Sequence, residues 1–352
     1  MLNMSKTLSP RSETILKSIV EQYIARALPV PSQSVLHNHG LDVSSATVRN
    51  EMMRLKQEGY IIQPHTSAGS VPSDKGYRYY VETLDDIRLP INQQRMINHL
   101  FHQVETRMEE WARLTATLLA NLSQNMAIVA TAKPDNCGFK HLELVSIQDS
   151  TALLVLVLQG AVVRQQLTVF NQPVSQTELS NISNKLNSIF AGLNNPQIQA
   201  KTAELNELEK GISDCILNIM KTEDEVEYEV PYLDGLQFIF NQPEFANARQ
   251  TTTSLALTEN KNLLRVILPD KLIGRGVHVF IGKENKSEAI QNYSVVISQY
   301  GLPGEAIGCI AVIGPTRMQY ARSIASVDYL AEVLSGLIAW LYGRKIPADA
   351  DN

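Results

Sequence analysis

The stretch SSATVRNEMMRLKQEG, residues 44–59, decides the fold class of the first part of this chain. It starts with serine, which caps helix N-termini, and it ends with glycine, which ends helices. Between them Val48, Met52 and Leu55 recur at spacings of four and three residues, so they share one face of a helix. The stretch therefore predicts a short amphipathic helix with one buried stripe and a polar remainder.

A shorter helix comes before this stretch. It begins at Ser32 and ends at Gly40, and a tight turn through 41–43 leads into the helix that follows. A further helix is predicted at 9–27, where apolar residues recur at helical spacing until two prolines end the pattern. Two helices joined by a short turn that contains glycine form a helix-turn-helix.

A wing is predicted after the helix-turn-helix. Residues 60–63 have the pattern of a strand, HTSAGSVPSD at 65–74 that of a loop, and 76–81 that of a second extended segment. A strand, a loop and a strand directly after a recognition helix form a wing. The sequence therefore predicts a winged helix-turn-helix DNA-binding domain over 1–88.

The polar face of the third helix suits the DNA major groove. Asn50 can pair with adenine through two hydrogen bonds, Arg49 can do so with guanine, and the Thr47 methyl can meet that of thymine. Ser44 and Ser45 stand at the helix N-terminus, where hydroxyls and free backbone N–H groups can bind phosphate. Alternatively, the arginines of this face form ion pairs with nearby glutamates.

The residues predicted to contact DNA come from the helices and from the wing. Those of the helices are Ser32, Ser44, Ser45, Thr47, Arg49, Asn50 and Arg54, and those of the wing are His65, Thr66, Ser67, Lys75 and Arg78. Residues 1–80 hold nine Lys or Arg and six Asp or Glu, a balance of +3, although the net charge of the chain is −5. The positive charge thus lies at the end where DNA contacts are predicted.

Residues 89–125 are predicted to form a connecting helix. Apolar residues and one threonine recur there at alternating steps of four and three residues, from Ile97 through Trp111 to Leu122. Such a heptad seam either pairs with a second copy of the chain or packs on the chain's own domain. The sequence leaves both possibilities open.

Beyond residue 126 the hydrophobic period changes from that of helices to that of strands. Strand patterns occur at 127–131, 142–147, 153–158, 162–169, 264–268, 276–281, 293–298 and 306–314. Helical patterns occur at 177–190, 203–220 and 316–342. These patterns predict an α+β fold, in which a domain built from 126–171 and 263–352 carries an insertion at 172–262.

The composition describes an ordered protein with more than one domain. The chain has 352 residues, of which 44% are hydrophobic and 19% charged, and it is too long for one ordinary core. We expect a cytoplasmic protein without membrane contact, because no apolar run reaches the ~18–20 residues that span a bilayer and no secretory signal is evident. Cys137, Cys215 and Cys309 form no CxxC pair, which argues against disulfides and a zinc site.

No catalytic constellation is found in the sequence. The seven histidines show no metal-ligand spacing such as HExxH, and no catalytic Ser/His/Asp set or carboxylate pair can be assigned. We therefore expect neither enzyme activity nor a cofactor. Arg317 could hold an anion at a helix end, but an ion pair within the protein is the preferred interpretation.

Three stretches carry a resemblance to a known family. ATVRNEMMRLKQEGYIIQPHTSAGSVPSDKGYRYYV at 46–81 closely resembles the N-terminal domain of HrcA-type heat-inducible transcription repressors. FIGKEN at 280–285 resembles that family's G-x-E-N segment, and GCIAVIGPTRMQY at 308–320 resembles its GPxRMxY signature. The resemblance runs across nearly the whole chain in the same order.

The resemblance implies a dimeric repressor of chaperone operons. Such a repressor binds double-stranded DNA at the inverted-repeat operator called CIRCE, and it consists of a winged helix-turn-helix, a GAF-like domain and an inserted dimerising domain. The chaperonin GroEL supports its activity, and repression is lost when unfolded protein occupies that chaperonin. The alternative is a ligand-sensing transcription regulator whose GAF-like domain binds a metabolite.

The chain departs from the family pattern at two places. Ser70 stands in the wing loop where the family usually has arginine, and 29–33 reads PVPSQ where the family usually reads PVGSR. Each missing arginine removes a possible phosphate contact, and with it part of the salt-dependent affinity for DNA.

Overall fold

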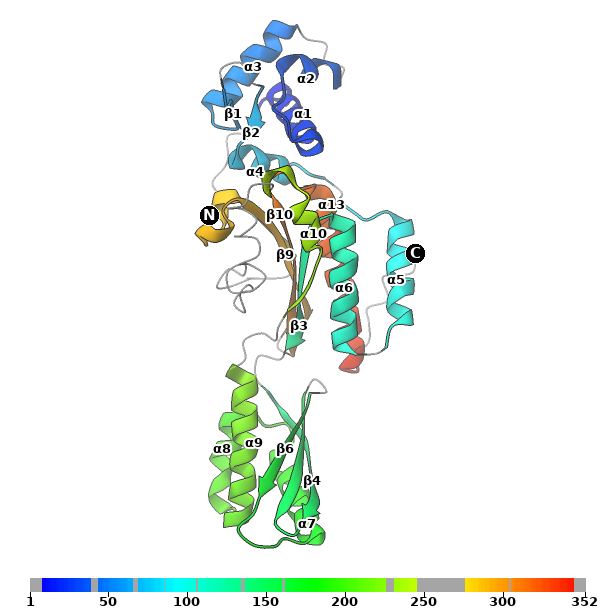
Figure 1. The fold of residues 1–352 in the computed structure, drawn as a ribbon, viewed down its shortest axis with the longest axis vertical. Coiled ribbons are helices and arrows are strands. Elements are labelled where there is room, and N and C mark those ends of the chain that lie inside the picture. The colour runs from blue at the N-terminus through cyan, green and yellow to red at the C-terminus, as the bar shows by residue number, and fades with distance from the viewer. Residues whose placement is uncertain are drawn as a thin grey trace. The chain divides into compact units, whose positions relative to one another are not determined.

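The computed structural model describes residues 8–38, 44–65, 69–85, 87–105, 107–133, 137–159, 162–225, 231–245, 276–303 and 305–344. The chain divides into two compact units (Figure 1). The first comprises 1–130, 230–300 and 309–334, and the second comprises 131–229, 301–308 and 335–352. The turn predicted at 41–43 and the strand predicted at 264–268 lie outside the described residues, as do Thr66 and Ser67.

The first unit opens with a group of short elements that we call the N-terminal bundle. Its elements are α1 (Pro10–Arg26), α2 (Ser32–Asn38), α3 (Ser45–Gln57), β1 (Ile61–Ile62), β2 (Val71–Pro72) and α4 (Asp74–Glu82). Strands β1 and β2 pair antiparallel, with Ile61 opposite Pro72. The three helices α1–α3 lie where the sequence predicts them.

Serine caps fix where these helices begin. Ser9 caps α1 by accepting a hydrogen bond from the Ser12 N–H at 3.2 Å, and Pro10 occupies the first turn. Ser44 caps α3 in the same way, accepting from the Thr47 N–H at 3.2 Å. The core of the bundle then forms from the apolar stripes of the two helices, Ile15, Leu16, Ile19 and Val20 of α1 and Val48 and Leu55 of α3.

The second extended segment predicted at 76–81 is wrong, because these residues belong to helix α4. Ser73 caps this helix by accepting from the Gly76 N–H at 3.2 Å. Tyr77 and Tyr80 lie three residues apart on the helix and are both buried. The second strand of the wing is instead the two-residue β2, which comes earlier in the chain.

A five-stranded sheet, here called the central sheet, lies mostly in the first unit. Its strands are, in spatial order, β7 (Tyr232–Asp234), β3 (Met126–Lys133), β10 (Ala306–Pro315), β9 (Tyr293–Leu302) and β8 (Val277–Ile281). Alternate residues such as Ile128, Val295 and Ala311 are fully buried in one core with Ile239 of α10 (Leu236–Phe240).

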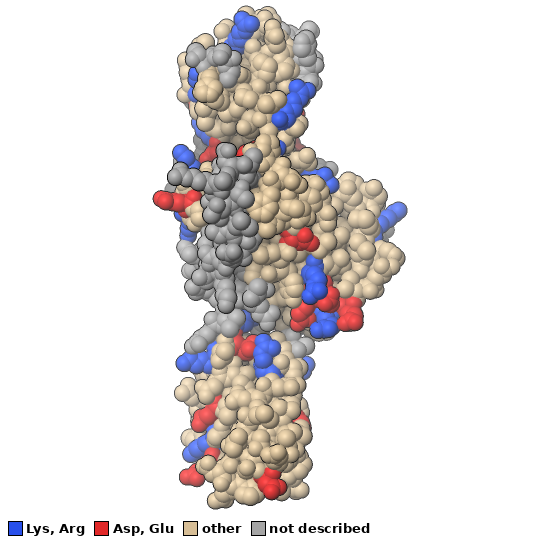
Figure 2. Space-filling view, viewed as in Figure 1, with Lys and Arg blue, Asp and Glu red and all other residues tan. Residues whose placement is uncertain are grey.

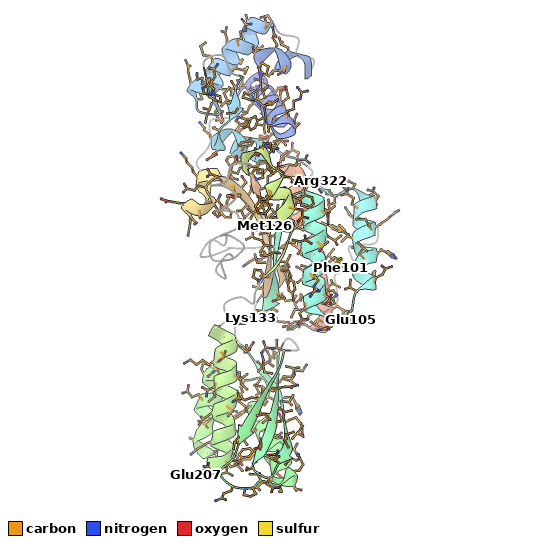
Figure 3. The ribbon with its side chains drawn as sticks, viewed as in Figure 1. Phe101, Glu105, Met126, Lys133, Glu207 and Arg322 are labelled. Atoms are coloured by element: carbon orange, nitrogen blue, oxygen red, sulfur yellow. The ribbon has the colours of Figure 1, made fainter. Side chains whose placement is uncertain are left out.

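The single connecting helix predicted over 89–125 is two helices, α5 (Ile91–Gln103) and α6 (Met108–Ser123). The chain is extended at Val104, where α5 ends. Phe101 is buried and lies between α5 and α6 in Figure 3. Trp111 and Leu122 of the seam are also buried within the single chain, so the seam packs on the chain's own domain.

The last described helix, α13 (Tyr320–Leu341), is long and apolar enough to cross a membrane by length and composition alone. However, Val327, Leu330, Leu334 and Ile338 are buried at the three- and four-residue spacing of a core helix. Packing inside the protein thus accounts for this apolar face of α13.

The second unit is a sheet covered by helices. It contains β4 (Phe139–Gln148), β5 (Thr151–Leu158), β6 (Val163–Val169), α7 (Gln176–Phe190), α8 (Asn195–Lys201) and α9 (Glu207–Glu225). The strands pair antiparallel in the order β4–β5–β6. Their inward residues, such as Leu142, Leu154 and Leu156, form a core with Leu186 of α7 and Ile216 of α9.

This second unit has limits that differ from those predicted for the insertion. The sequence placed the insertion at 172–262, whereas the compact unit takes in 131–229. The reason is that β4, β5 and β6 pair with one another and not with the strands of the central sheet. A buried strand shows the same alternation in either sheet, so the hydrophobic pattern could not assign these three.

Candidate nucleic-acid interface

Helix α3 divides into a buried and an exposed face. Val48, Met52 and Leu55 face the core, as the spacing predicts. On the other side Arg49 and Asn50 are exposed, and neither side chain forms a hydrogen bond or ion pair to any residue that the structure describes. These two side chains are thus available to an external partner.

An exposed apolar residue lies on the same face. Met53 is 59% exposed and lies four residues after Arg49, while Lys56 is exposed and lies seven residues after it. Residues at i, i+4 and i+7 share a helix face. The sequence reasoning missed Lys56, although this spacing from Arg49 would have identified it. Its ammonium donates a hydrogen bond of 3.1 Å to Oε1 of Gln63, directly after β1.

The N-terminus of α3 is exposed and offers anion-binding groups. The Ser44 hydroxyl caps the helix and lies 3.0 Å from the Thr47 hydroxyl, and Ser45 is exposed beside it. First-turn N–H groups have no intrahelical partner, and the helix dipole adds positive potential there. Ser32 is half-buried in the first turn of α2.

Arg54 forms an ion pair with a nearby glutamate, which is the alternative to DNA contact that the sequence left open. Its Nε donates to Oε1 of Glu58 at 3.0 Å, one turn along the same helix. This neighbour also raises the pKa of the Arg54 guanidinium above its ordinary value. Arg54 is therefore tied to its own helix, whereas Arg49 is not.

Two residues of the proposed wing differ in exposure. One is a predicted DNA contact, and the other is the serine that replaces the arginine usual in the family. His65 is exposed after β1. Ser70, by contrast, is buried and pairs with Val30 through two backbone hydrogen bonds of 2.8 and 2.9 Å. The side chain at position 70 is thus held against the segment before α2.

Lys75 and Arg78 lie on α4 and not on a wing strand, and both side chains bind protein groups. The Lys75 ammonium donates to the Glu58 carbonyl at 2.8 Å and lies 4.1 Å from the centroid of the Tyr60 ring. Arg78 forms an ion pair with Glu284. Both were predicted as residues of the wing, and their contact with DNA stays a prediction.

The charges of the described surface fit an anionic partner at the N-terminal bundle. On the face shown in Figure 2, Lys and Arg are scattered over α1–α3 and Asp and Glu are few. Among the acidic residues of the bundle, Glu51 accepts a hydrogen bond from the Ser12 hydroxyl at 2.7 Å. Glu13 and Glu58 pair with Lys17 and Arg54. Glu13 and Glu58 thus each have a cationic neighbour on their own helix.

Three comparisons with known proteins agree. The family model described as "HrcA protein C terminal domain" matches residues 109–324. A protein of Dehalococcoides mccartyi named heat-inducible transcription repressor HrcA is 51% identical over 337 residues, which are 96% of this chain and 98% of that protein. A protein of the same name from Roseiflexus castenholzii is 38% identical over 350 residues, 97% of each chain. A solved structure of a hypothetical protein, 20% identical, covers 95% of this chain and 100% of that chain with a TM-score of 0.60, and it supports the fold alone.

Proposed function

The chain belongs to the HrcA family of heat-inducible transcription repressors, and we propose that it binds an inverted-repeat operator of the CIRCE type through a winged helix-turn-helix. In this proposal α2 and α3 form the helix-turn-helix, and β1 and β2 form the wing. Helix α3 enters the major groove, which is wide enough to admit one helix. The family acts in transcription and not as an enzyme, and we propose no cofactor.

The observation that carries this proposal is the exposed face of α3. Arg49 and Asn50 are the residue types that read guanine and adenine, and in the described structure neither side chain has an internal partner. Met53 on the same face offers an apolar contact to thymine methyl groups. Ser44, Ser45 and the helix N-terminus supply phosphate contacts that fix the register.

We propose that the second unit is the dimerising domain. Helices cover one face of its sheet, and the other face carries the cross-strand row Val145, Leu153 and Leu167. Leu167 is 62% exposed and Val169 is 73% exposed, and Figure 2 shows mostly uncharged surface over β4 and β6. A second copy that covers this face would supply the two-fold symmetry that an inverted repeat requires.

The remaining parts of the proposal concern regulation. We propose that the central sheet with α6 and α13 is the GAF-like domain, that heat releases the repressor from its operator, and that the chaperonin GroEL maintains the active form. Purified protein should then lose operator binding on mild heating, and added chaperonin should restore it. Protein that regains full binding on cooling without chaperonin would contradict this part alone.

A gel-shift experiment tests the DNA-binding proposal. The full chain is titrated with a duplex that contains an inverted repeat and with a scrambled duplex of equal length. We expect Asn50→Ala to lose preference for the inverted repeat by about 1–3 kcal/mol per affected half-site, with little effect on the scrambled duplex. Asn181→Ala, an exposed asparagine of α7, is the matched control. Unchanged discrimination in Asn50→Ala would show that α3 does not read the bases.

A further inference from the structure

Helix α4 of the N-terminal bundle is held by a segment some two hundred residues later in the chain. Nε of Arg78 donates to Oε1 of Glu284 at 2.9 Å, and its second nitrogen binds the other carboxylate oxygen. The same guanidinium donates to the Val279 carbonyl at 2.5 Å. A two-point arginine–carboxylate contact fixes orientation as well as distance.

Asp74, one turn earlier on α4, binds the same segment. Its carboxylate accepts a hydrogen bond of 3.0 Å from the Lys283 N–H. It also encloses Gly282, which has a φ of +53° and where a Cβ would overlap the carboxylate. Glycine adopts this conformation without strain, and the missing Cβ leaves room for the carboxylate of Asp74.

A second separate segment contacts the bundle from the start of α13. The Tyr320 ring lies 5.8 Å from the Tyr77 ring, centroid to centroid, and the Tyr320 hydroxyl is held by Ser294 at 2.8 Å. Arg317 donates to the Ile24 carbonyl of α1 at 3.3 Å, and an ion pair with Glu244 holds its guanidinium. The preference for an ion pair at Arg317 is thus confirmed.

These two segments are the FIGKEN and GPTRMQY signatures of the sequence. In the described structure their charged and aromatic side chains Glu284, Arg317 and Tyr320 contact the N-terminal bundle. We propose that the two signatures form a clamp on α1 and α4 that couples the stability of the central sheet to that of the DNA-binding helices. The inference rests on the proposed function, because it assigns regulation to the same DNA-binding site.

The contacts of the clamp suit two parts that can separate and re-form their contact, more than two parts that are held together permanently. The Arg78 and Glu284 side chains are 28% and 34% exposed, so water reaches the pair and opening does not leave a fully buried charge. Polar contacts of this kind are typical of interfaces between parts that move relative to each other. When such a contact couples its two sides, linkage makes the effect reciprocal, so DNA bound to the bundle also stabilises the central sheet.

Hydrogen exchange of the full chain, followed by mass spectrometry, tests the clamp. The probe is the inverted-repeat duplex, and the variants are Arg78→Met and Glu284→Gln. In the wild type we expect the duplex to slow exchange in α1 and α3 and also, by about fivefold or more, in β8 and β9. In both variants we expect protection of α1 and α3 only. Glu305→Gln, which breaks the exposed pair with Arg344, is the control and should behave as wild type.

Two results would overturn the inference. One is a wild type in which the duplex protects α1 and α3 but leaves β8 and β9 unchanged. The other is a pair of variants in which the protection of β8 and β9 persists. A wild type that shows no protection anywhere would instead contradict the proposed function. In that case the clamp is tested without DNA. Arg78→Met should then speed hydrogen exchange in α4 and β8 together. Unchanged exchange in these two elements would overturn the clamp.

Discussion

The hydroxyl of Ser12 in α1 donates a hydrogen bond of 2.7 Å to the carboxylate of Glu51 in α3. Ser12 is fully buried, and its hydroxyl also lies 2.8 Å from that of Ser9. The start of α1 is thus tied to the middle of α3, at the residue next to Asn50.

Ser12→Ala should therefore loosen α3, the proposed recognition helix. Removal of the hydroxyl leaves the carboxylate of Glu51 without its donor, and the loss should be about 1–2 kcal/mol of the unfolding free energy of the N-terminal bundle. We expect faster amide exchange in α1 and α3 and weaker operator binding with an unchanged salt slope. The exposed Ser188→Ala of α7 serves as control, and equal stability of the two variants would refute the role of this bond.

Arg49 and Lys75 should differ in a salt titration of DNA binding. Arg49 has no partner among the described residues. Its cation would displace counterions from the DNA as well as read guanine, so Arg49→Met should reduce the slope of log affinity against log salt by up to about one and also weaken discrimination at the guanine that it reads. Lys75 is engaged by the Glu58 carbonyl and the Tyr60 ring. We expect Lys75→Met to keep the slope of the wild type. If the salt slope of Lys75→Met is instead lower than that of the wild type by about one, the Lys75 ammonium contacts a DNA phosphate.

The apolar sheet face of the second unit predicts the effect of a charge at its centre. Leu167→Asp should separate the proposed dimer, because burial of a leucine contributes about 1.5–3 kcal/mol per copy and an unpaired carboxylate opposes it. Sedimentation at several concentrations measures the change. Asn184→Asp, exposed on helix α7, should leave association unaltered. If Leu167→Asp associates like the wild type, dimers form through another surface.

Gly76 and Gly211 form a natural pair of test sites, since both lie inside helices. A Cβ at Gly76 would overlap the backbone carbonyl of Tyr60, whereas a Cβ at Gly211 meets nothing within 4 Å. Gly76→Ala should destabilise the protein by about 1–3 kcal/mol through overpacking. Gly211→Ala should stabilise α9 by about 0.5–1 kcal/mol. Chemical denaturation of both variants measures the difference, and a stabilised Gly76→Ala would contradict the close approach of α4 to Tyr60.

The pKa of Glu209 indicates how the stability of the second unit depends on pH in the acid range. Burial raises the pKa of Glu209, but hydrogen bonds from Lys185 and from the Asn206 N–H outweigh burial, and the pKa falls below its ordinary value of 4.5. A lowered pKa contributes stability that is present above pH 4.5 and is lost as the pH falls through the folded-state pKa. Glu209→Gln should therefore flatten the acid dependence of the unfolding free energy below pH 4.5. A variant whose acid dependence equals that of the wild type would refute this contribution.

Helix α3 could be predicted from sequence because its signals are local. The spacing of Val48, Met52 and Leu55 settles which face of α3 is buried, and so it also settles that Arg49 and Asn50 are exposed. The role of Lys75 and Arg78 could not be predicted in this way. Arg78 binds Glu284, and no local pattern connects two residues that far apart.

The wrong element type at 76–81 and the difference between the predicted domain limits and the compact units have a similar cause. Tyr77 and Tyr79 favour strands by propensity, but the cap at Ser73 and the burial of four α4 residues favour a helix. The seam from Ile97 to Leu122 keeps its period across the break near Val104, because α5 and α6 pack on the same domain. A periodic pattern reports burial, and it does not report which neighbour provides it.

The separation of Arg78 and Glu284 also has a consequence for newly made protein. The two residues are 206 positions apart, and a ribosome adds about 5–20 residues per second. The helices that we assign to DNA recognition therefore leave the ribosome roughly 10–40 s before their clamp exists. During synthesis each copy passes through an interval in which its N-terminal bundle is complete but unsecured.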